Sequence, residues 1–195
     1  ISANAEDVGA YMKLGGAVYW DRVPWTEIGR LIGMVTEELG QTKPVMSQTA
    51  FQQPLELFNN RNMIGLYQFA RNHPERNGKD VISFILEKSS LAITAQDVIN
   101  HIEGERSVYW DRIPQDEVIK LLKLATEEAG VSLANLNTAD LQRPLASLHG
   151  RSLIGLYGYF GNHPERQGKD TLDFIYEKLE IKITANDVVA QMKAG

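Results

Sequence analysis

The sequence predicts an all-α protein built from two tandem copies of one helical domain of 90 residues, with about five helices in each copy. The stretch Ala5-Glu6-Asp7-Val8 recurs as Ala95-Gln96-Asp97-Val98 and again as Ala185-Asn186-Asp187-Val188, each step being 90 residues without a gap. Apolar residues recur at helical spacing, and no segment keeps the alternation of a strand. A repeat of this length is long enough to bury its own core, so we expect two domains rather than a solenoid.

The repeat sets the expected domain boundaries. Residues 18–22 return as 108–112 and residues 72–76 return as 162–166, so the register holds across the whole copy. We expect one domain at residues 1–94 and a second at 95–184. Residues 185–195 are either the start of a third copy or the terminal helix of the second domain.

Each copy is expected to open with a short helix. A polar cap, Asn4, Thr94 or Thr184, stands three residues before an aspartate, which places a carboxylate on the positive end of the helix. In the first copy this helix should stop at Gly15 and Gly16.

A longer second helix is expected after Pro24 and Pro114, because proline suits the first helical position. Gly40 and Gly130 should end it. Its buried stripe keeps the i, i+3, i+4, i+7 spacing, at Ile28, Leu31, Ile32 and Val35 in the first copy and at Val118, Leu121, Leu122 and Ala125 in the second.

The rest of each copy is expected to hold a loop and two or three helices. Residues 41–50 and 131–140 share no identity, which favours surface side chains, although 138–141 can open a short helix. A core helix should follow at 62–69 and 152–160, after Asn60 and Gly150, which tolerate positive φ, and with Asn62 and Ser152 as N-caps. Inside it, Gly65 and Gly155 mark a close approach. The last helix should be capped by Asp80 and Asp170 and end near Lys88 and Lys178.

Composition limits the function classes. No apolar run is long enough to cross a bilayer and no signal peptide is visible, so we expect a cytoplasmic protein that does not enter membranes. Cysteine is absent, which excludes disulfides and thiolate metal sites. Because the chain starts at Ile1 and stops inside a repeated motif, we expect it to be a fragment of a larger protein.

No catalytic pattern emerges. A metal or general-base role for His73 and His163 lacks a second nitrogen ligand and the HExxH spacing, so each is expected to lie in a capped turn that ties two helices together. Trp20 and Trp110 are expected to anchor the core, with Arg22 across the Trp20 ring, rather than to form an exposed platform. We expect no enzyme activity, no metal site and no cofactor.

Basic side chains gather around the start of the core helix and the loop after it. A helix N-terminus with nearby arginines binds anions, so these cations can contact phosphates. The alternative is a solvated face that pairs with Glu75, Asp80 and Glu87. The candidate nucleic-acid-binding residues are Arg61, Asn62, Arg71, Arg76 and Lys79 in the first copy, and Arg151, Ser152, Arg166 and Lys169 in the second.

Several of these pieces together resemble the homing-endonuclease-associated repeat. They are Trp25-Thr26-Glu27-Ile28 opening a helix that closes at Glu38-Leu39-Gly40, a variable loop, and a short helix that ends in an aromatic residue; in the second copy they are 117–130, 152–160 and 174–181. The family's Phe-Gly-Ser-Trp signature is only echoed, by residues 160–163, and the second copy has Gln115 in place of the opening tryptophan. The family consists of small tandem DNA-binding helical modules, so the resemblance implies that residues 62–68 and 152–159 lie near nucleic acid.

The leading expectation is therefore a non-catalytic nucleic-acid-binding tandem module. The formal net charge of -5 opposes this function, because non-specific affinity comes mainly from neutralising phosphates. The alternative partner is another protein, bound by a scaffolding or interaction repeat. A positive stripe shared by both copies would favour nucleic acid, and an exposed apolar groove would favour protein.

Overall fold

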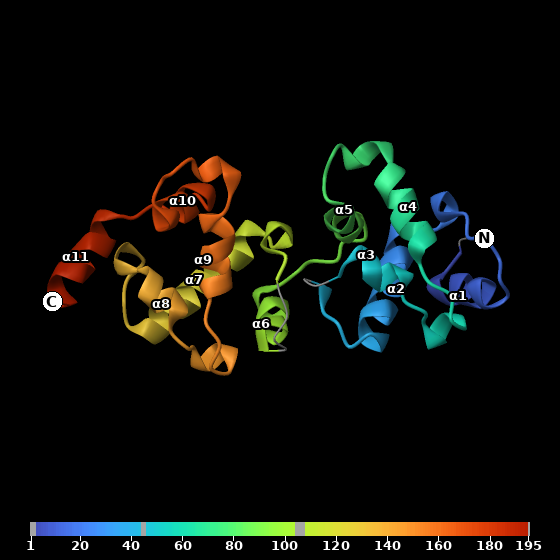
Figure 1. The fold of residues 1–195 in the computed structure, drawn as a ribbon, viewed down its shortest axis with the longest axis horizontal. Coiled ribbons are helices and arrows are strands. Elements are labelled where there is room, and N and C mark those ends of the chain that lie inside the picture. The colour runs from blue at the N-terminus through green and yellow to red at the C-terminus, as the bar shows by residue number, and fades with distance from the viewer. Residues whose placement is uncertain (1–2, 44–45, 104–107, 195) are drawn as a thin grey trace. The chain divides into compact units, whose positions relative to one another are not determined.

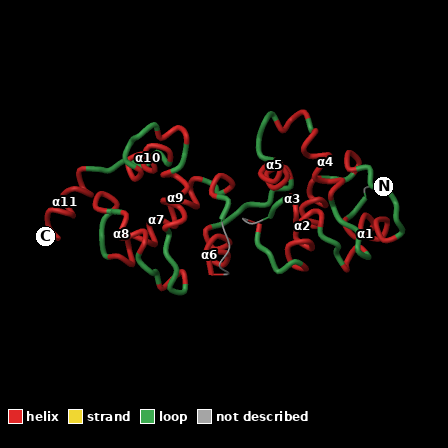
Figure 2. Tube along the Cα trace, in the orientation of Figure 1, coloured by secondary structure: helices red, strands yellow, loops and turns green. Residues whose placement is uncertain are grey.

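The computed structural model describes residues 3–43, 46–103 and 108–194, which form α-helices, short 3-10 turns and loops (Figures 1 and 2). No strand occurs among these residues, and the all-α prediction is confirmed. The nearest approach to a sheet is a pair of isolated antiparallel bridges, Leu55 with Arg61 and Leu145 with Arg151, each of which closes the turn before a helix.

Contacts divide the chain into unit 1, residues 1–92, and unit 2, residues 93–195. The described α-helices of unit 1 are α1 (Ala5–Lys13), α2 (Trp25–Glu38), α3 (Gln48–Gln52), α4 (Ile64–Asn72) and α5 (Val81–Lys88). Its 3-10 turns are η1 (Trp20–Arg22), η3 (Glu56–Phe58) and η4 (Pro74–Arg76).

The elements of unit 1 recur in unit 2 in the same order, and the described residues of unit 2 form one further 3-10 turn and one further helix. Its α-helices are α6 (Ala95–Glu103), α7 (Gln115–Ala129), α8 (Thr138–Gln142), α9 (Ile154–Gly161), α10 (Thr171–Lys178) and α11 (Ala185–Ala194). Its 3-10 turns are η5 (Trp110–Arg112), η6 (Leu133–Asn135), η7 (Ala146–Leu148) and η8 (Pro164–Arg166). None of the described helices has the length and apolar character needed to span a bilayer.

The core of unit 1 forms where the helices' apolar faces meet. The predicted stripe of α2, from Ile28 to Val35, is fully buried, which confirms the helical periodicity. Helix α4 lies against α3 and α5 and contributes Leu66 and Ala70 to the core. Helix α1 lies against α2 and η3. The equivalent helices α8, α9 and α10 are in contact in unit 2.

Most predicted caps are confirmed and some move by a residue or two. Asn4 accepts a hydrogen bond from the backbone N–H of Asp7 at 2.7 Å, and Asp80 accepts one from Ser83 at 2.9 Å. Pro24 and Pro114 are N-caps rather than first helical residues, because their ψ angles of 141° and 142° are extended. The core helices start at Ile64 and Ile154, so Asn62 and Ser152 are not their N-caps.

The expectation that residues 41–50 and 131–140 carry only surface side chains is wrong. Residues 44 and 45 lie outside the described residues, but Met46 is fully buried and Leu136, which occupies the same position of unit 2, is 6% exposed. The two residues are not identical, so an identity comparison does not find them. Both side chains are apolar, and their burial holds each loop to the core of its unit.

Glutamates of the long helices cap the N-termini of other elements. The carboxylate of Glu27 accepts a hydrogen bond from the backbone N–H of Ala5 at 2.9 Å, and that of Glu117 accepts one from Ala95 at 2.6 Å. Glu38 likewise accepts from the backbone N–H groups of Glu56 and Leu57. These bonds satisfy N–H groups that a helix start leaves without partners. The bonds of Glu27 and Glu117 also fix the first helix of each unit to the second.

We expect Glu117 to make unit 2 sensitive to acid. Its hydrogen bond with Lys120, together with the Ala95 N–H, lowers the pKa of its carboxyl below the usual 4.5. A lowered folded-state pKa means that its stabilisation is present above the unfolded value and is lost as the pH falls through the folded value. Urea unfolding between pH 7 and pH 3 should show a smaller decrease of unit 2 stability for Glu117→Gln than for the unchanged chain.

The control for this measurement is Glu180→Gln. The Glu180 side chain makes no hydrogen bond or ion pair with the described residues, so the substitution should leave the acid transition of unit 2 where it is. An unchanged acid transition in Glu117→Gln would contradict the assigned role.

Candidate functional site

The arginine of each His-Pro-Glu-Arg loop is occupied within its own unit. The Arg76 guanidinium donates hydrogen bonds to the carbonyl oxygens of Arg71, at 2.9 Å, and of Lys79. Arg166 does the same with Gly161, at 2.8 Å, and with Lys169. Both arginines therefore close the loop between two helices, and their donors point at backbone.

The lysines of these loops are paired with acids. Lys79 lies 2.6 Å from a carboxylate oxygen of Glu87, and Lys169 pairs in the same way with Glu177. Glu75 and Glu165 pair with lysines of the last helices, Lys88 and Lys178, and these hydrogen bonds lower the pKa of both glutamates. Much of the predicted cationic cluster is therefore neutralised locally.

Arg61 is differently placed. Together with Trp20, Asn60, Asn62 and Gly65 it lines a hollow of 270 Å³ at the start of α4. Its guanidinium lies beside Gly15 and makes no hydrogen bond or ion pair with the described residues. The Asn62 side chain accepts a hydrogen bond from the Ile64 N–H at 3.3 Å and is therefore turned toward its own backbone.

The remaining candidates do not join Arg61. Arg71 is exposed near the C-terminal end of α4, whereas Arg61 precedes the start of that helix, and the helical rise from Ile64 to Arg71 alone is roughly 10 Å. In unit 2, Arg151 is exposed but has interactions within the protein, and Ser152 is half-buried. The predicted residues therefore do not form one repeated cationic surface.

His73 lies in an aromatic cluster instead of a polar site. Its ring is 5.9 Å from that of Trp25, 5.4 Å from Phe69 and 5.3 Å from Phe84, and its Nδ1 accepts a hydrogen bond from the Glu75 N–H. His163 is held in the same way against Tyr159 and Phe174. Each histidine caps its 3-10 turn and joins two helices, as predicted. Among the described residues no group of three or more acidic or histidine side chains could hold a metal ion.

The motif Tyr-Trp-Asp-Arg splits between core and surface. Trp20 and Trp110 are 8% and 7% exposed, so their core role is confirmed. The arginine was expected to lie across the tryptophan, but the Arg22 guanidinium stands 4.8 Å from the ring centroid of Tyr19. In unit 2, Arg112 stands 4.2 Å from Tyr109. The reason is that the buried tryptophan has no free face, whereas Tyr19 is 64% exposed.

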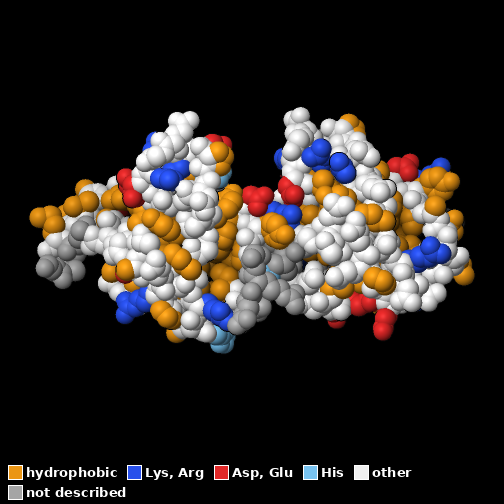
Figure 3. Space-filling view, in the orientation of Figure 1, with side chains coloured by type: hydrophobic (Ala, Val, Ile, Leu, Met, Phe, Trp, Pro, Cys, Tyr) orange, Lys and Arg blue, Asp and Glu red, His pale blue; other side chains and the backbone are white. Residues whose placement is uncertain are grey.

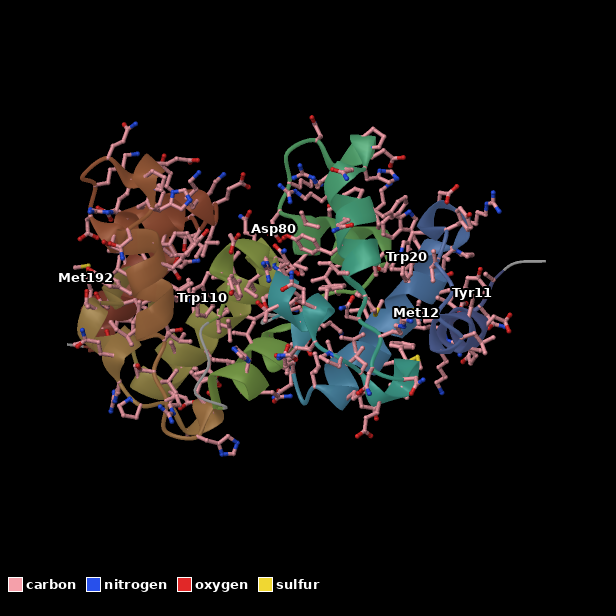
Figure 4. The ribbon with its side chains drawn as sticks, turned by 45° about the vertical axis from the view of Figure 1, so that its right-hand side comes forward. Tyr11, Met12, Trp20, Asp80, Trp110 and Met192 are labelled. Carbon is pink, nitrogen blue, oxygen red and sulfur yellow. The ribbon has the colours of Figure 1, made fainter. Side chains whose placement is uncertain are left out.

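An apolar cavity of 300 Å³ lies beside this tyrosine in unit 1. We call it the tyrosine pocket; its lining includes Val8, Tyr11, Val18, Tyr19, Arg22 and Val23. Val8 and Val23 are almost fully buried and form its floor, while Tyr11 is 49% exposed and stands with Tyr19 at the rim. Tyr11 projects from α1, where it lies next to Met12 in the chain (Figure 4). Asp7 and Arg22 supply one charge of each sign.

Unit 2 keeps only part of this arrangement. Tyr109 is 42% exposed beneath Arg112, but the position of Tyr11 is occupied by His101, which is 3% exposed. The tyrosine and arginine pair is therefore common to both units, while the second aromatic wall belongs to unit 1. The exposure of Tyr11 and Tyr19 was not predicted. The repeated Tyr-Trp-Asp-Arg motif was a signal for Tyr19 alone, because Tyr11 lies outside it.

The surface view gives the same picture of the charges. On the face shown in Figure 3, lysines and arginines lie in separate small groups next to acidic and apolar side chains.

No protein-family model, curated protein or solved structure matches the chain.

Proposed function

We propose that the chain is a non-catalytic tandem recognition protein, and that unit 1 binds an apolar segment of a partner protein in the tyrosine pocket. The observation that carries the proposal is the pocket itself, whose floor is apolar and whose rim holds two exposed tyrosines and an arginine. Tyrosine and arginine are enriched among the residues that contribute most of the energy of protein interfaces. An apolar side chain of a peptide fits a cavity of 300 Å³.

The charge of the chain is compatible with this partner. A formal net charge of -5 weakens association with phosphates but does not oppose burial of an apolar side chain. The opposite charges of Asp7 and Arg22 at the pocket allow contacts with the polar backbone or with flanking side chains of a peptide. The partner is therefore a peptide segment with an aromatic or branched apolar residue at its centre.

Nucleic acid is the second candidate partner, and Arg61 is the observation that favours it. An arginine without a protein partner among the described residues, beside a helix start and a hollow of 270 Å³, can contact a phosphate. The loop arginines and lysines offer less, because they bind backbone carbonyls and glutamates. This function predicts salt-dependent binding that depends on Arg61.

The test is a selection of peptides from a displayed random library against the 195-residue chain, followed by anisotropy with the selected peptides. Tyr19→Ser should weaken their binding by about tenfold or more, as expected for an interface anchor, whereas Tyr109→Ser and Arg61→Ala should leave it within about twofold. The Tyr109 substitution is the matched control because it removes the equivalent ring from unit 2.

Labelled single- and double-stranded DNA and RNA are measured in parallel from low to physiological salt. Oligonucleotide binding that falls with salt and with Arg61→Ala, but survives Tyr19→Ser, would replace the protein partner by nucleic acid. If neither Tyr19→Ser nor Tyr11→Ser changes the affinity of the selected peptides, the tyrosine pocket is not their binding site.

A further inference from the structure

Helix α11 exposes the residues that its equivalents bury. Val8 of α1 is 4% exposed and Val98 of α6 is 0% exposed, but Val188 of α11 is 43% exposed. Met12 is 5% exposed, whereas Met192 is 78% exposed and projects from the C-terminal end of unit 2 (Figure 4). The three helices share one sequence register, so an apolar face that is core in two of them is open in the third.

The helix is nevertheless built like the other two. Thr184 accepts a hydrogen bond from the Asp187 N–H at 3.3 Å, and the Asp187 carboxylate accepts one from the Thr184 N–H at 2.7 Å. Thr94 and Asp97 form the same reciprocal pair at the start of α6. The N-terminus of α11 therefore has the same capping bonds as that of α6. The difference between the two helices lies in what packs against them.

The two buried equivalents show what covers such a face. Helix α1 lies against α2 and η3, and α6 lies against α7 and η7, so each is covered by the second helix and a later 3-10 turn of its own unit. In both cases a glutamate of the second helix also binds the first backbone N–H of the short helix. Helix α11 lies instead against η6, a turn that Tyr176 already joins to α10 through a hydrogen bond to the Leu133 carbonyl.

We infer that α11 is the first helix of a third module, and that its face of Val188, Val189 and Met192 binds the second helix and the later 3-10 turn of that module. The occupant is a further copy of this repeat that follows α11 in the same chain. The order of the elements supports this occupant, because α1 and α6 each precede the helices that bury them. A contribution of α11 to the core of unit 2 is the competing assignment.

Matched substitutions in the 195-residue chain separate the two assignments. Val98→Asp places an unpaired charge in a fully buried site and should lower the unfolding temperature of unit 2 by roughly 15 °C or more. Val188→Asp should shift it by less than about 2 °C, because half-exposed sites tolerate a charge. Val98→Ser and Val188→Ser are milder versions of the same pair, for use if Val98→Asp prevents folding.

A longer chain completes the test. Residues 106–184 are repeated after residue 195, which continues the register of the repeat. This chain should show a third protected set of amides in hydrogen-deuterium exchange, and Val188→Asp should now abolish that set while leaving units 1 and 2 unchanged. A loss of unit 2 stability with Val188→Asp in the 195-residue chain would overturn the inference, as would an added segment that fails to fold or that folds equally well with Val188→Asp.

Discussion

Replacing Gly9 by Ile is expected to destabilise unit 1 by about 1–3 kcal/mol, the usual effect of overfilling a packed core. A Cβ atom at Gly9 would lie 3.0 Å from Cε1 of Phe58, whose ring is fully buried. Isoleucine forms helices better than glycine, but this gain of about 0.5 kcal/mol is smaller than the steric effect. Hydrogen-deuterium exchange under increasing urea measures the loss in unit 1 separately from unit 2.

The second unit shows how the clash can be relieved. There the equivalent positions hold Ile99 and Leu148, both buried, and α6 lies against η7 as α1 lies against η3. Unit 2 therefore fills this site with two aliphatic side chains of equal size, where unit 1 has a glycine in the helix and a phenylalanine in the turn. Phe58→Leu alone should destabilise unit 1 by about 1 kcal/mol through lost contacts, yet in combination with Gly9→Ile it should restore most of the stability.

The size of this rescue is a coupling free energy, expected to be at least about 1 kcal/mol. Ile99→Gly and Leu148→Phe in unit 2 form the reverse cycle and serve as its control. Additive effects of the two substitutions in unit 1 would show that Gly9 and Phe58 do not share one packing site.

The parts of the fold that the sequence predicted are those set by residues close together in the chain. The stripe from Ile28 to Val35 needs only helical spacing, and the caps Asn4 and Asp80 act on N–H groups three residues away. For the same reason the histidine turn was predicted, because His73 binds the backbone of Glu75. Local rules suffice where the partner lies within a turn of helix.

The parts that the sequence did not predict depend on partners that only the fold brings together. Glu27 caps a helix that starts 22 residues earlier, and no spacing rule connects it with Ala5. The role of Arg76 in closing its loop was not predicted, because backbone carbonyl partners have no side-chain signature in the sequence. The tyrosine pocket needs α1 and η1 side by side, so Tyr11 and Tyr19 carried no joint signal in the sequence.

Gly65→Ala and Gly155→Ala, the same substitution at equivalent positions, are expected to change the stability of their units in opposite directions. A Cβ atom at Gly65 would lie 3.0 Å from Nε1 of Trp20, but at Gly155 it would lie 3.7 Å from Nε1 of Trp110, an ordinary contact. Both tryptophans are buried, so neither ring can swing away into solvent. Gly65→Ala should therefore destabilise unit 1 by about 1–2 kcal/mol, while Gly155→Ala should stabilise unit 2 by about 0.5 kcal/mol, because alanine forms helices better than glycine.

Unfolding in urea with exchange resolved for each unit gives both signs in one experiment. Trp20→Phe supplies the control, since phenylalanine lacks the Nε1 atom that the new methyl group would meet, and in that background Gly65→Ala should no longer be unfavourable. Equal destabilisation of the two units would mean that each glycine is needed for its backbone rather than for the ring beside it. A rescue by Trp20→Phe would instead establish that the tryptophan of the Tyr-Trp-Asp-Arg motif determines which residue α4 can carry at position 65.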